Sequence, residues 1–430
     1  MNTQTIGFNK IKCTNTRFRI FLNYVMLFML AAQSSVPFFI GDEYLIAFFF
    51  LSLIVYLSKP IIIDKFIFNY IAIFFIILIA QAIFFWVFEF NTISGYLLRI
   101  GYAYLTIKVI GNKFDDYYIN IIYFFAILSL VIYIPNLISN GALNDILLKI
   151  SKLFQPYQLH DPGRQHILIY TFGQNYLDND GSVFNITFRN SGPFWEPGGF
   201  GVFLILAIIF ETIKSQKIIT KKNIIFSIAT LTTLSTGSFI AFFFLVIFYF
   251  LTYHTPKRIF IIILFFIGST FIFLNSPFLV DKFNNQFYAS QKSLAYAPRN
   301  RFVSGKLDLI DFLNNPIFGT SRYEQFRFKY KESKFETIVN HRNNGTTNLL
   351  VEFGIFGFFT FFYFMFKSFK IFCSVNKFKK SFSIYVIFII LILGFSQMIF
   401  IKPFFIGLSF LFLSNGYKSK IMEKSIRKNS

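Results

Sequence analysis

Cysteine is nearly absent from this chain, which has only two in 430 residues. Cys13 and Cys373 are too few for a disulfide framework, and both fall on the inner side of the topology derived below. The sequence also lacks internal repeats and the His and Cys spacings that are typical of zinc sites. We therefore predict no metal, no cofactor and a fold that disulfides do not stabilise.

Charge is scarce as well. Charged residues make up 14% of the chain and hydrophobic residues 55%, and the mean hydropathy is +0.57. Many apolar runs approach or exceed the roughly 20 residues that cross ~30 Å of hydrocarbon. This pattern excludes a soluble fold and predicts an all-α integral membrane protein that crosses the membrane many times.

The apolar runs predict a defined topology. We expect about twelve transmembrane helices, at residues 20–40, 44–58, 66–88, 93–111, 119–139, 198–213, 223–237, 238–253, 259–275, 349–368, 383–400 and 403–415. The first is interpreted as an uncleaved signal anchor. With the N-terminus inside, more than half of the 41 Lys and Arg fall in the internal segments, and Lys402 alone lies in a short external one. Because cytoplasmic loops are enriched in Lys and Arg, both termini are predicted to be cytoplasmic.

The expected topology divides the chain into five parts. Residues 1–139 hold the first five spans, residues 200–275 the next four, and residues 349–430 the last three with a basic cytoplasmic tail. Two long periplasmic loops, 140–199 and 276–348, lie between them. Loops of this length are usually functional or disordered, and their aromatic, Pro and Gly residues favour partial order over the membrane face.

The second long loop has a surplus of Lys and Arg over acidic residues. Arginine offers phosphate a planar fork that is always charged, so the surplus suggests an anionic ligand at the outer surface. The alternative is that long loops escape the orientation rule and their charge has no functional meaning. The net charge of +21 means less in a membrane protein than the placement of its Lys and Arg residues. We predict no nucleic-acid partner.

The most polar and most bent stretch between two apolar runs is FRNSGPFWEPGGFG, residues 188–201. Pro197 predicts the start of a helix, because proline at the first helical position costs little. The free amides at a helix N-terminus attract anions, and Arg189 lies just upstream. The stretch could bind a phosphate with Glu196 as a nearby base, or Glu196 could simply cap the helix.

A second polar cluster, NHRNNGTTNLLVEFGIFG, ends the second long loop. Thr347 or Asn348 is expected to cap the next helix, which places Glu352 about one turn inside the outer boundary. An ionisable residue at this depth is costly and is a candidate functional residue. Either His341 or Glu352 could act as a base. Arg99, in the fourth span, is a further ligand or an arginine paired within the bundle.

Four segments, in order along the chain, resemble elements of one known family. Residues 189–199, RNSGPFWEPGG, resemble an R-x-x-G-x-F-x-E-P element, and LSTGS at 234–238 resembles the serine-rich start of a span. Arg301, fifteen residues before PIFG at 316–319, resembles the arginine that precedes a P-L-x-G turn. Residues 341–357 resemble an H-N-x-x-L-x-x-x-x-E-x-G-x-x-G element. The chain thus resembles the superfamily of O-antigen polymerases and O-antigen ligases.

Two positions depart from the family pattern. Thr236 occupies a place where the ligases usually have an arginine, and this favours a polymerase. His341 lies eleven residues before Glu352 where the family spacing is nine, and Asn343 fills the expected position. A role for Arg301 is therefore better supported than one for His341.

The resemblance implies a metal-independent glycosyltransferase of the bacterial inner membrane, with its active site facing the periplasm. It would move a growing glycan from undecaprenyl diphosphate to the next lipid-linked repeat unit. Expected partners are the undecaprenyl-diphosphate-linked donor and acceptor, and the chain-length regulator and flippase of the same pathway. The alternatives are an O-antigen ligase, which would use lipid A core as acceptor, and a repeat-unit flippase.

The resemblance and the residue patterns together give a set of candidate site residues. The candidate catalytic residues are Glu196, His341 and Glu352. The candidate diphosphate-binding residues are Arg164, Arg189, Arg299, Arg301 and Arg342.

Overall fold

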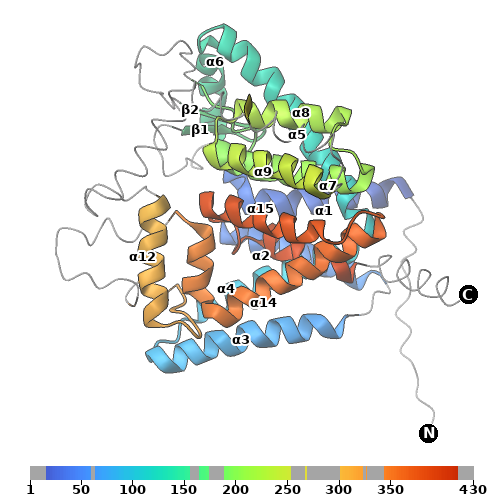
Figure 1. Ribbon diagram of the computed structural model, residues 1–430. Coiled ribbons are helices and arrows are strands. Elements are labelled where there is room, and N and C mark those ends of the chain that lie inside the picture. Colours follow the sequence, from blue (N-terminus) through green and yellow to red (C-terminus); the bar gives the residue numbers. More distant parts are fainter. Residues whose placement is uncertain are drawn as a thin grey trace, which may run out of the picture.

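The fold of this chain is a bundle of helices with a small hairpin at one end (Figure 1). The computed structural model describes residues 16–59, 63–154, 164–173, 188–252, 267–268, 301–322, 326 and 343–414. The predicted helical architecture is confirmed, except that two short strands, β1 (Arg164–Ile167) and β2 (Tyr170–Gly173), form an antiparallel pair.

Most of the expected spans correspond to helices. The first half of the chain forms α1 (Thr16–Ser35), η1 (Pro37–Phe39), α2 (Asp42–Leu57), α3 (Lys65–Phe85), α4 (Phe90–Ile110), η2 (Gly111–Lys113), α5 (Phe114–Ile138), α6 (Ala142–Ser151) and η3 (Lys152–Phe154). The second half forms α7 (Pro197–Ser215), α8 (Lys221–Thr232), α9 (Thr236–Thr252), α12 (Arg301–Asn314), α14 (Gly345–Val375), α15 (Phe382–Ser396), α16 (Pro403–Leu408) and η6 (Leu411–Leu413). Most of the predicted span 259–275 lies outside the described residues.

Several helices are suited to a membrane. Within the described residues, four helical segments are long and apolar enough to cross one: Lys65–Phe85, Phe90–Ile138, Pro197–Ser215 and Gly345–Val375. The second of these contains both α4 and α5, and α9 and α15 are shorter apolar helices. These segments support a membrane protein, whereas the number twelve stays a prediction.

The expected span at 403–415 is wrong as one continuous helix. Pro403 starts a helix of six residues, and the chain then turns into η6. All residues from 403 to 413 are buried. An apolar run that packs inside a bundle has the same composition as one that faces lipid, so hydropathy alone does not separate the two.

Helix α7 forms the centre of the bundle. Its residues from Pro197 to Phe210 are all buried, and 83% of its apolar window is buried compared with 39% for α3. An apolar helix can be covered by lipid or by protein, and α7 is covered mainly by protein. The covering residues include Phe404 of α16, whose ring centroid lies 5.0 Å from that of Phe203. The first residue of α7 is therefore held in place by the whole bundle.

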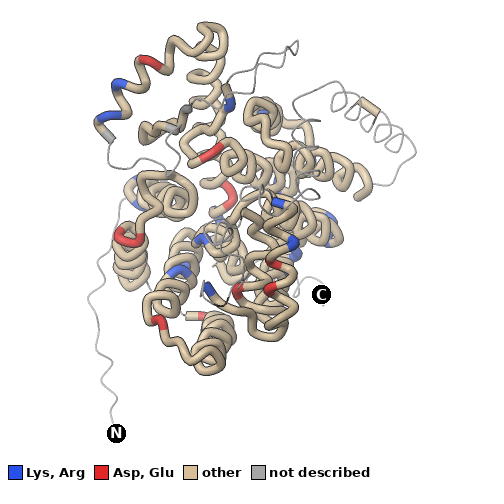
Figure 2. The backbone as a smooth tube through the Cα atoms, turned by 90° about the vertical axis from the view of Figure 1, so that its left-hand side faces the viewer, with Lys and Arg blue, Asp and Glu red and all other residues tan. Residues whose placement is uncertain are grey.

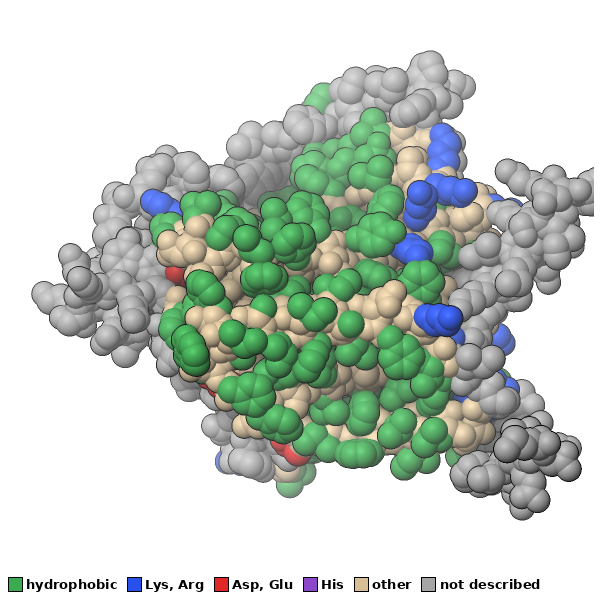
Figure 3. Space-filling model, turned by 90° about the horizontal axis from the view of Figure 1, so that it is seen from below, with side chains coloured by type: hydrophobic (Ala, Val, Ile, Leu, Met, Phe, Trp, Pro, Cys, Tyr) green, Lys and Arg blue, Asp and Glu red, His purple; other side chains and the backbone are tan. Residues whose placement is uncertain are grey.

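Charged residues are few along the helices (Figure 2). In a view from below, apolar side chains cover the middle of the molecule and Lys and Arg side chains gather along the right-hand edge (Figure 3). One buried ion pair joins Lys108 Nζ to Asp64 Oδ2 at 2.7 Å, and Lys108 also donates to the carbonyl oxygen of Leu413 at 2.9 Å. The pair connects α4 to the residue before α3 and to η6.

Helix α14 is broken at Gly354, whose φ of 62° and ψ of −169° are not helical. The turn at residues 316–319 fills the break. The amides of Thr320 and Ser321 donate to the carbonyl oxygens of Val351 and Glu352 at 2.8 and 3.1 Å, and the amide of Ile355 donates to the carbonyl oxygen of Pro316 at 2.9 Å. Backbone groups freed by a break need such partners in an apolar environment.

Glycine is required on both sides of this contact. A Cβ on Gly354 would lie 2.2 Å from the carbonyl oxygen of Ile317, and a Cβ on Gly319, at φ +75°, would lie 2.3 Å from that of Val351. The side-chain amide of Gln81 in α3 also donates to the carbonyl oxygen of Glu352, at 2.7 Å. The helix break thus joins α3 and the turn after α12 to α14.

We predict that Gly354→Ala destabilises the protein by about 3 kcal/mol or more, because the new Cβ both strains the backbone and collides with the turn. Unfolding of the purified protein in detergent measures the effect. Gly95→Ala is the matched control, because a Cβ there meets nothing within 4 Å and alanine favours the helix by about 1 kcal/mol. Equal stability of the two variants would contradict the packing described here.

Candidate functional site

The stretch at 188–201 is bent because it bonds to three separate parts of the fold. The amide of Asn190 donates to the carbonyl oxygen of Thr232 at 3.0 Å, and the amide of Trp195 donates to that of Ser35 at 3.0 Å. The carbonyl oxygen of Gly192, where φ is +51°, accepts from Thr171 of β2 at 2.7 Å. These contacts fix the start of α7 against α8, α1 and the hairpin.

Helix α7 begins at Pro197, as predicted, and Glu196 is its N-cap residue. The Glu196 carboxylate makes no capping hydrogen bond to the helix. Instead, Nε2 of Gln397, which follows α15, donates to Glu196 Oε1. The interpretation that Glu196 simply caps the helix is therefore wrong, and its carboxylate faces another element.

Gly198 makes the approach of Gln397 possible. A Cβ at this position would lie 2.3 Å from Gln397 Nε2 and 3.2 Å from Glu196 Oε1. Glycine near a helix start disfavours the helix by up to about 1 kcal/mol relative to alanine. The close approach of the Gln397 and Glu196 side chains explains why glycine follows Pro197.

Arg301 is the first residue of α12 and lies within electrostatic range of Glu196. Burial lowers the pKa of Arg301, and the charge of Glu196 acts in the opposite direction. An arginine remains protonated in spite of such shifts. The structure thus brings two predicted site residues within electrostatic range of each other. Glu196 lies at the end of the first long loop, and Arg301 lies inside the second.

The start of α14 holds α12 in position. Asn344 caps α14, because its Oδ1 accepts from the amides of Thr346 and Thr347 at 3.1 Å, and its Nδ2 donates to the carbonyl oxygen of Arg301 at 3.4 Å. The predicted caps, Thr347 and Asn348, are wrong. The hydroxyl of Thr347 donates to Asp308 Oδ2 in α12 at 2.6 Å instead. The cap and this contact place Arg301 beside the start of α14.

Arg189 bonds to the turn between α8 and α9. Its Nε donates to the carbonyl oxygen of Thr233 at 3.1 Å and its Nη2 to that of Leu234 at 3.0 Å. Leu234 has a φ of +48°, so these bonds stabilise a turn that leucine rarely adopts. This contact gives Arg189 a structural task, and its role in binding diphosphate stays a prediction.

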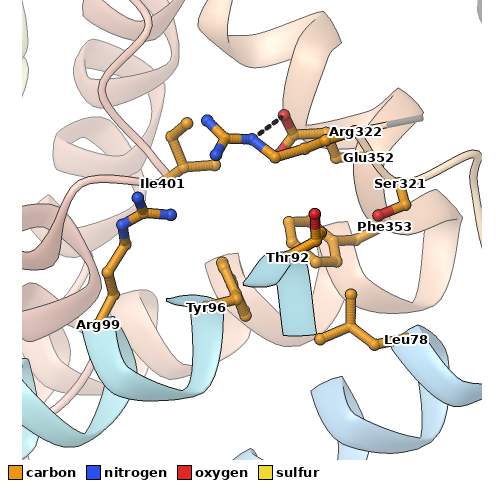
Figure 4. Close-up of a pocket in the computed structure, with 9 residues that line it drawn as sticks. All are labelled: Leu78, Thr92, Tyr96, Arg99, Ser321, Arg322, Glu352, Phe353 and Ile401. Atoms are coloured by element: carbon orange, nitrogen blue, oxygen red, sulfur yellow. Dashed lines mark ion pairs between the residues drawn. The ribbon is translucent and has the colours of Figure 1, made fainter. Parts of the chain in front are cut away.

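Glu352 lies in a pocket on the other side of α14. Its side chain is buried, its Oε1 accepts from Asn348 Nδ2 at 3.0 Å, and the same oxygen lies 3.5 Å from Arg322 Nε. The pocket is lined by Leu78, Thr92, Tyr96, Arg99, Ser321, Arg322, Glu352, Phe353 and Ile401 (Figure 4). Arg99 pairs with Asp42, whose Oδ1 is 3.4 Å from Arg99 Nη2.

Four predicted residues have no described side chain. Arg299, His341 and Arg342 lie outside the described residues, and Arg164 is described only as the first residue of β1, opposite Gly173. Their roles stay predictions. Among the described residues, no three of His, Cys, Asp and Glu lie together as metal ligands would.

Sequence analysis missed Gln397 and Arg322 as site residues and gave Lys402 no role beyond topology. Burial, and after it the charges of Arg99 and Arg322, lowers the pKa of Lys402 to about 8. The signal that was present is the position of Gln397 and Lys402, two polar side chains in the short connection between two apolar runs. In a membrane protein such residues are candidates for function.

Residues 223–362 match the family model described as O-Antigen ligase. This segment supports the predicted resemblance to the superfamily of O-antigen polymerases and O-antigen ligases. The matched segment contains Arg301, Arg322 and Glu352, whereas Glu196 and Gln397 lie outside it. Members of this family are glycosyltransferase-like enzymes, and the apolar helices agree with a membrane protein of this kind. A comparison with curated proteins gave no match.

We predict that Gln397→Leu lowers the free energy of unfolding by about 1–3 kcal/mol, because it removes a donor from a partly buried carboxylate. Unfolding in detergent of this variant, Glu196→Gln and the double variant forms a double-mutant cycle. We expect a coupling energy of at least about 0.5 kcal/mol between the two sites. Strictly additive effects would show that the two side chains do not interact.

Proposed function

We propose that this protein is an O-antigen polymerase. It transfers the growing glycan from undecaprenyl diphosphate to the next lipid-linked repeat unit. The observation that supports this proposal best is that Glu196, the N-cap residue of α7 in the polymerase-like element, lies within electrostatic range of Arg301, the first residue of α12. An acid, a permanent cation and a helix N-terminus are the groups that this transfer needs.

The chemistry assigns a task to each group. The acceptor sugar hydroxyl attacks the anomeric carbon of the donor glycan, and the bond from that carbon to the diphosphate oxygen breaks. Glu196 accepts the hydroxyl proton, and Arg301 stabilises the charge on the departing diphosphate. Because the leaving group is already a diphosphate, arginine can stabilise it without a metal ion.

Glu196 is the preferred proton acceptor among the described candidates. Its carboxylate is oriented by Gln397 and lies within electrostatic range of Arg301. Glu352 is instead oriented by Asn348 and contacts Arg322. His341 stays an alternative base from the sequence alone.

The proposed reaction takes place at the periplasmic face of the bacterial inner membrane. In support, Lys and Arg gather along one edge of the molecule, as expected for a cytoplasmic side. Helix α12, which begins with Arg301, lies at the left of the molecule in Figure 1. Figure 3 keeps the same left and right, so α12 lies at the end away from the Lys and Arg edge. Both termini are then cytoplasmic, and the flippase and chain-length regulator of the pathway are the proposed protein partners.

The second candidate function is O-antigen ligation to lipid A core. The description of the matching family as O-Antigen ligase favours it. Thr236, at the start of α9, stands where ligases usually have arginine and favours the polymerase. The two functions share donor and chemistry and differ in acceptor.

We predict that Arg301→Ala and Glu196→Ala each abolish the O-antigen ladder in a deletion strain of the native host. Loss of leaving-group stabilisation or of the base slows transfer by at least about 100-fold. Silver-stained gels of lipopolysaccharide measure the ladder, after each variant is confirmed in the membrane. Lys306→Ala is the control, because Lys306 is an exposed cation in the same helix α12. A full ladder from both site variants would overturn the proposed site.

The deletion strain itself distinguishes the two candidate functions. A polymerase deletion is expected to leave a core that bears a single repeat unit. A ligase deletion would leave bare core, with polymer accumulating on undecaprenyl diphosphate. An unchanged ladder would reject both.

A further inference from the structure

The pocket around Glu352 has no task in the transfer step proposed above. It lies between α3, α4 and α14, and residues 321–322 and Ile401 complete its wall. The hydrogen bond from the Ser321 amide to the carbonyl oxygen of Glu352 holds Arg322 beside the helix break. The wall that carries Arg322 is thus fixed by backbone contacts.

Two guanidinium groups point into this pocket and towards each other, one from α4 and one from residue 322 (Figure 4). The Arg99 side chain is 17% exposed, and its partner Asp42 is 82% exposed and 3.4 Å away. Arg322 contacts Glu352 through Nε alone, at 3.5 Å. A guanidinium has five N–H donors, so within the described part of the chain these single contacts leave donors for a ligand.

The charge of the pocket is unbalanced. Arg99 and Arg322 line the pocket with one buried carboxylate, Glu352. Asp42, the carboxylate that pairs with Arg99, is 82% exposed. Lys402, outside the lining, is a third positive group within electrostatic range of both arginines. Gathering like charges in a partly dry pocket is unfavourable unless an anion joins them. Planar, paired donors of this kind suit the oxygens of a phosphate group.

The proposed reaction needs a second place for a diphosphate. The donor glycan reacts at the sugar attached to its carrier, so its diphosphate lies at the reacting carbon. The acceptor reacts at the far end of its repeat unit, so its own diphosphate lies about one repeat unit away. The two diphosphates therefore cannot share Arg301.

We propose that the pocket lined by Arg99 and Arg322 binds the diphosphate of the acceptor, the incoming lipid-linked repeat unit. The inference rests on the proposed polymerase function. Its apolar lining of Leu78, Phe353 and Ile401 suits a ligand that carries a lipid chain. An anionic phospholipid headgroup has the same phosphate chemistry, and the experiment separates these two sources.

Native mass spectrometry of the purified protein in detergent, with undecaprenyl diphosphate added, tests the proposal. We expect two bound lipids on the wild type, one on Arg99→Gln/Arg322→Gln, one on Arg301→Gln and none on the triple variant. Asp42→Asn is the matched control, because it removes the ion pair of Arg99 and keeps the guanidinium, and it should bind two. Arg99→Lys/Arg322→Lys keeps the charge and should retain part of the second binding event.

Three results would overturn the subsite. The first is two bound lipids on Arg99→Gln/Arg322→Gln. The second is a single lipid on the wild type that is lost only with Arg301→Gln, which would leave the transferase function intact and favour a ligase. The third is displacement of the second lipid by phosphatidylglycerol at equal concentration, which would assign the pocket to a phospholipid. No binding of undecaprenyl diphosphate to the wild type would overturn the proposed function as well.

Discussion

The carbonyl groups freed where α14 breaks at Gly354 accept hydrogen bonds from the amides of Thr320 and Ser321, which follow the turn at residues 316–319, and from Gln81. Much of the site depends on this contact. It joins the C-terminal end of α12 to α14, while Asn344 joins the other end of α12 to the start of α14. Arg301 and Arg322 are thereby held at opposite ends of the segment formed by α12 and the turn that follows it.

Sequence patterns predicted the elements whose signal is local. The start of α7 at Pro197 and most apolar helices follow from proline geometry and from apolar runs, which neighbouring residues determine. The bond of Asn344 to Arg301, the bond of Gln397 to Glu196 and the convergence of Arg99 with Arg322 depend on residues far apart in the chain. Such contacts leave no pattern in a single sequence. Glu196 and Glu352 could therefore be named from the sequence, whereas their contacts with Gln397 and Arg322 could not.

The family match covers only part of the candidate site. Residues 223–362 supply Arg301, Arg322 and Glu352, whereas Glu196, Gln397 and Arg99 come from segments before and after it. The N-terminal helices and the connection after α15 thus contribute residues to both candidate sites. A fragment limited to the matched segment would lack one half of each.

The burial of α7 from Pro197 to Phe210 has a consequence for the Glu196 carboxylate that precedes it. A helix packed on every side cannot tilt or slide without repacking its neighbours, because protein interiors are as dense as crystals. The Glu196 carboxylate, at the N-terminal end of this helix, therefore has a fixed position in the bundle. In the proposed reaction, the glycan therefore moves past a carboxylate that stays in place.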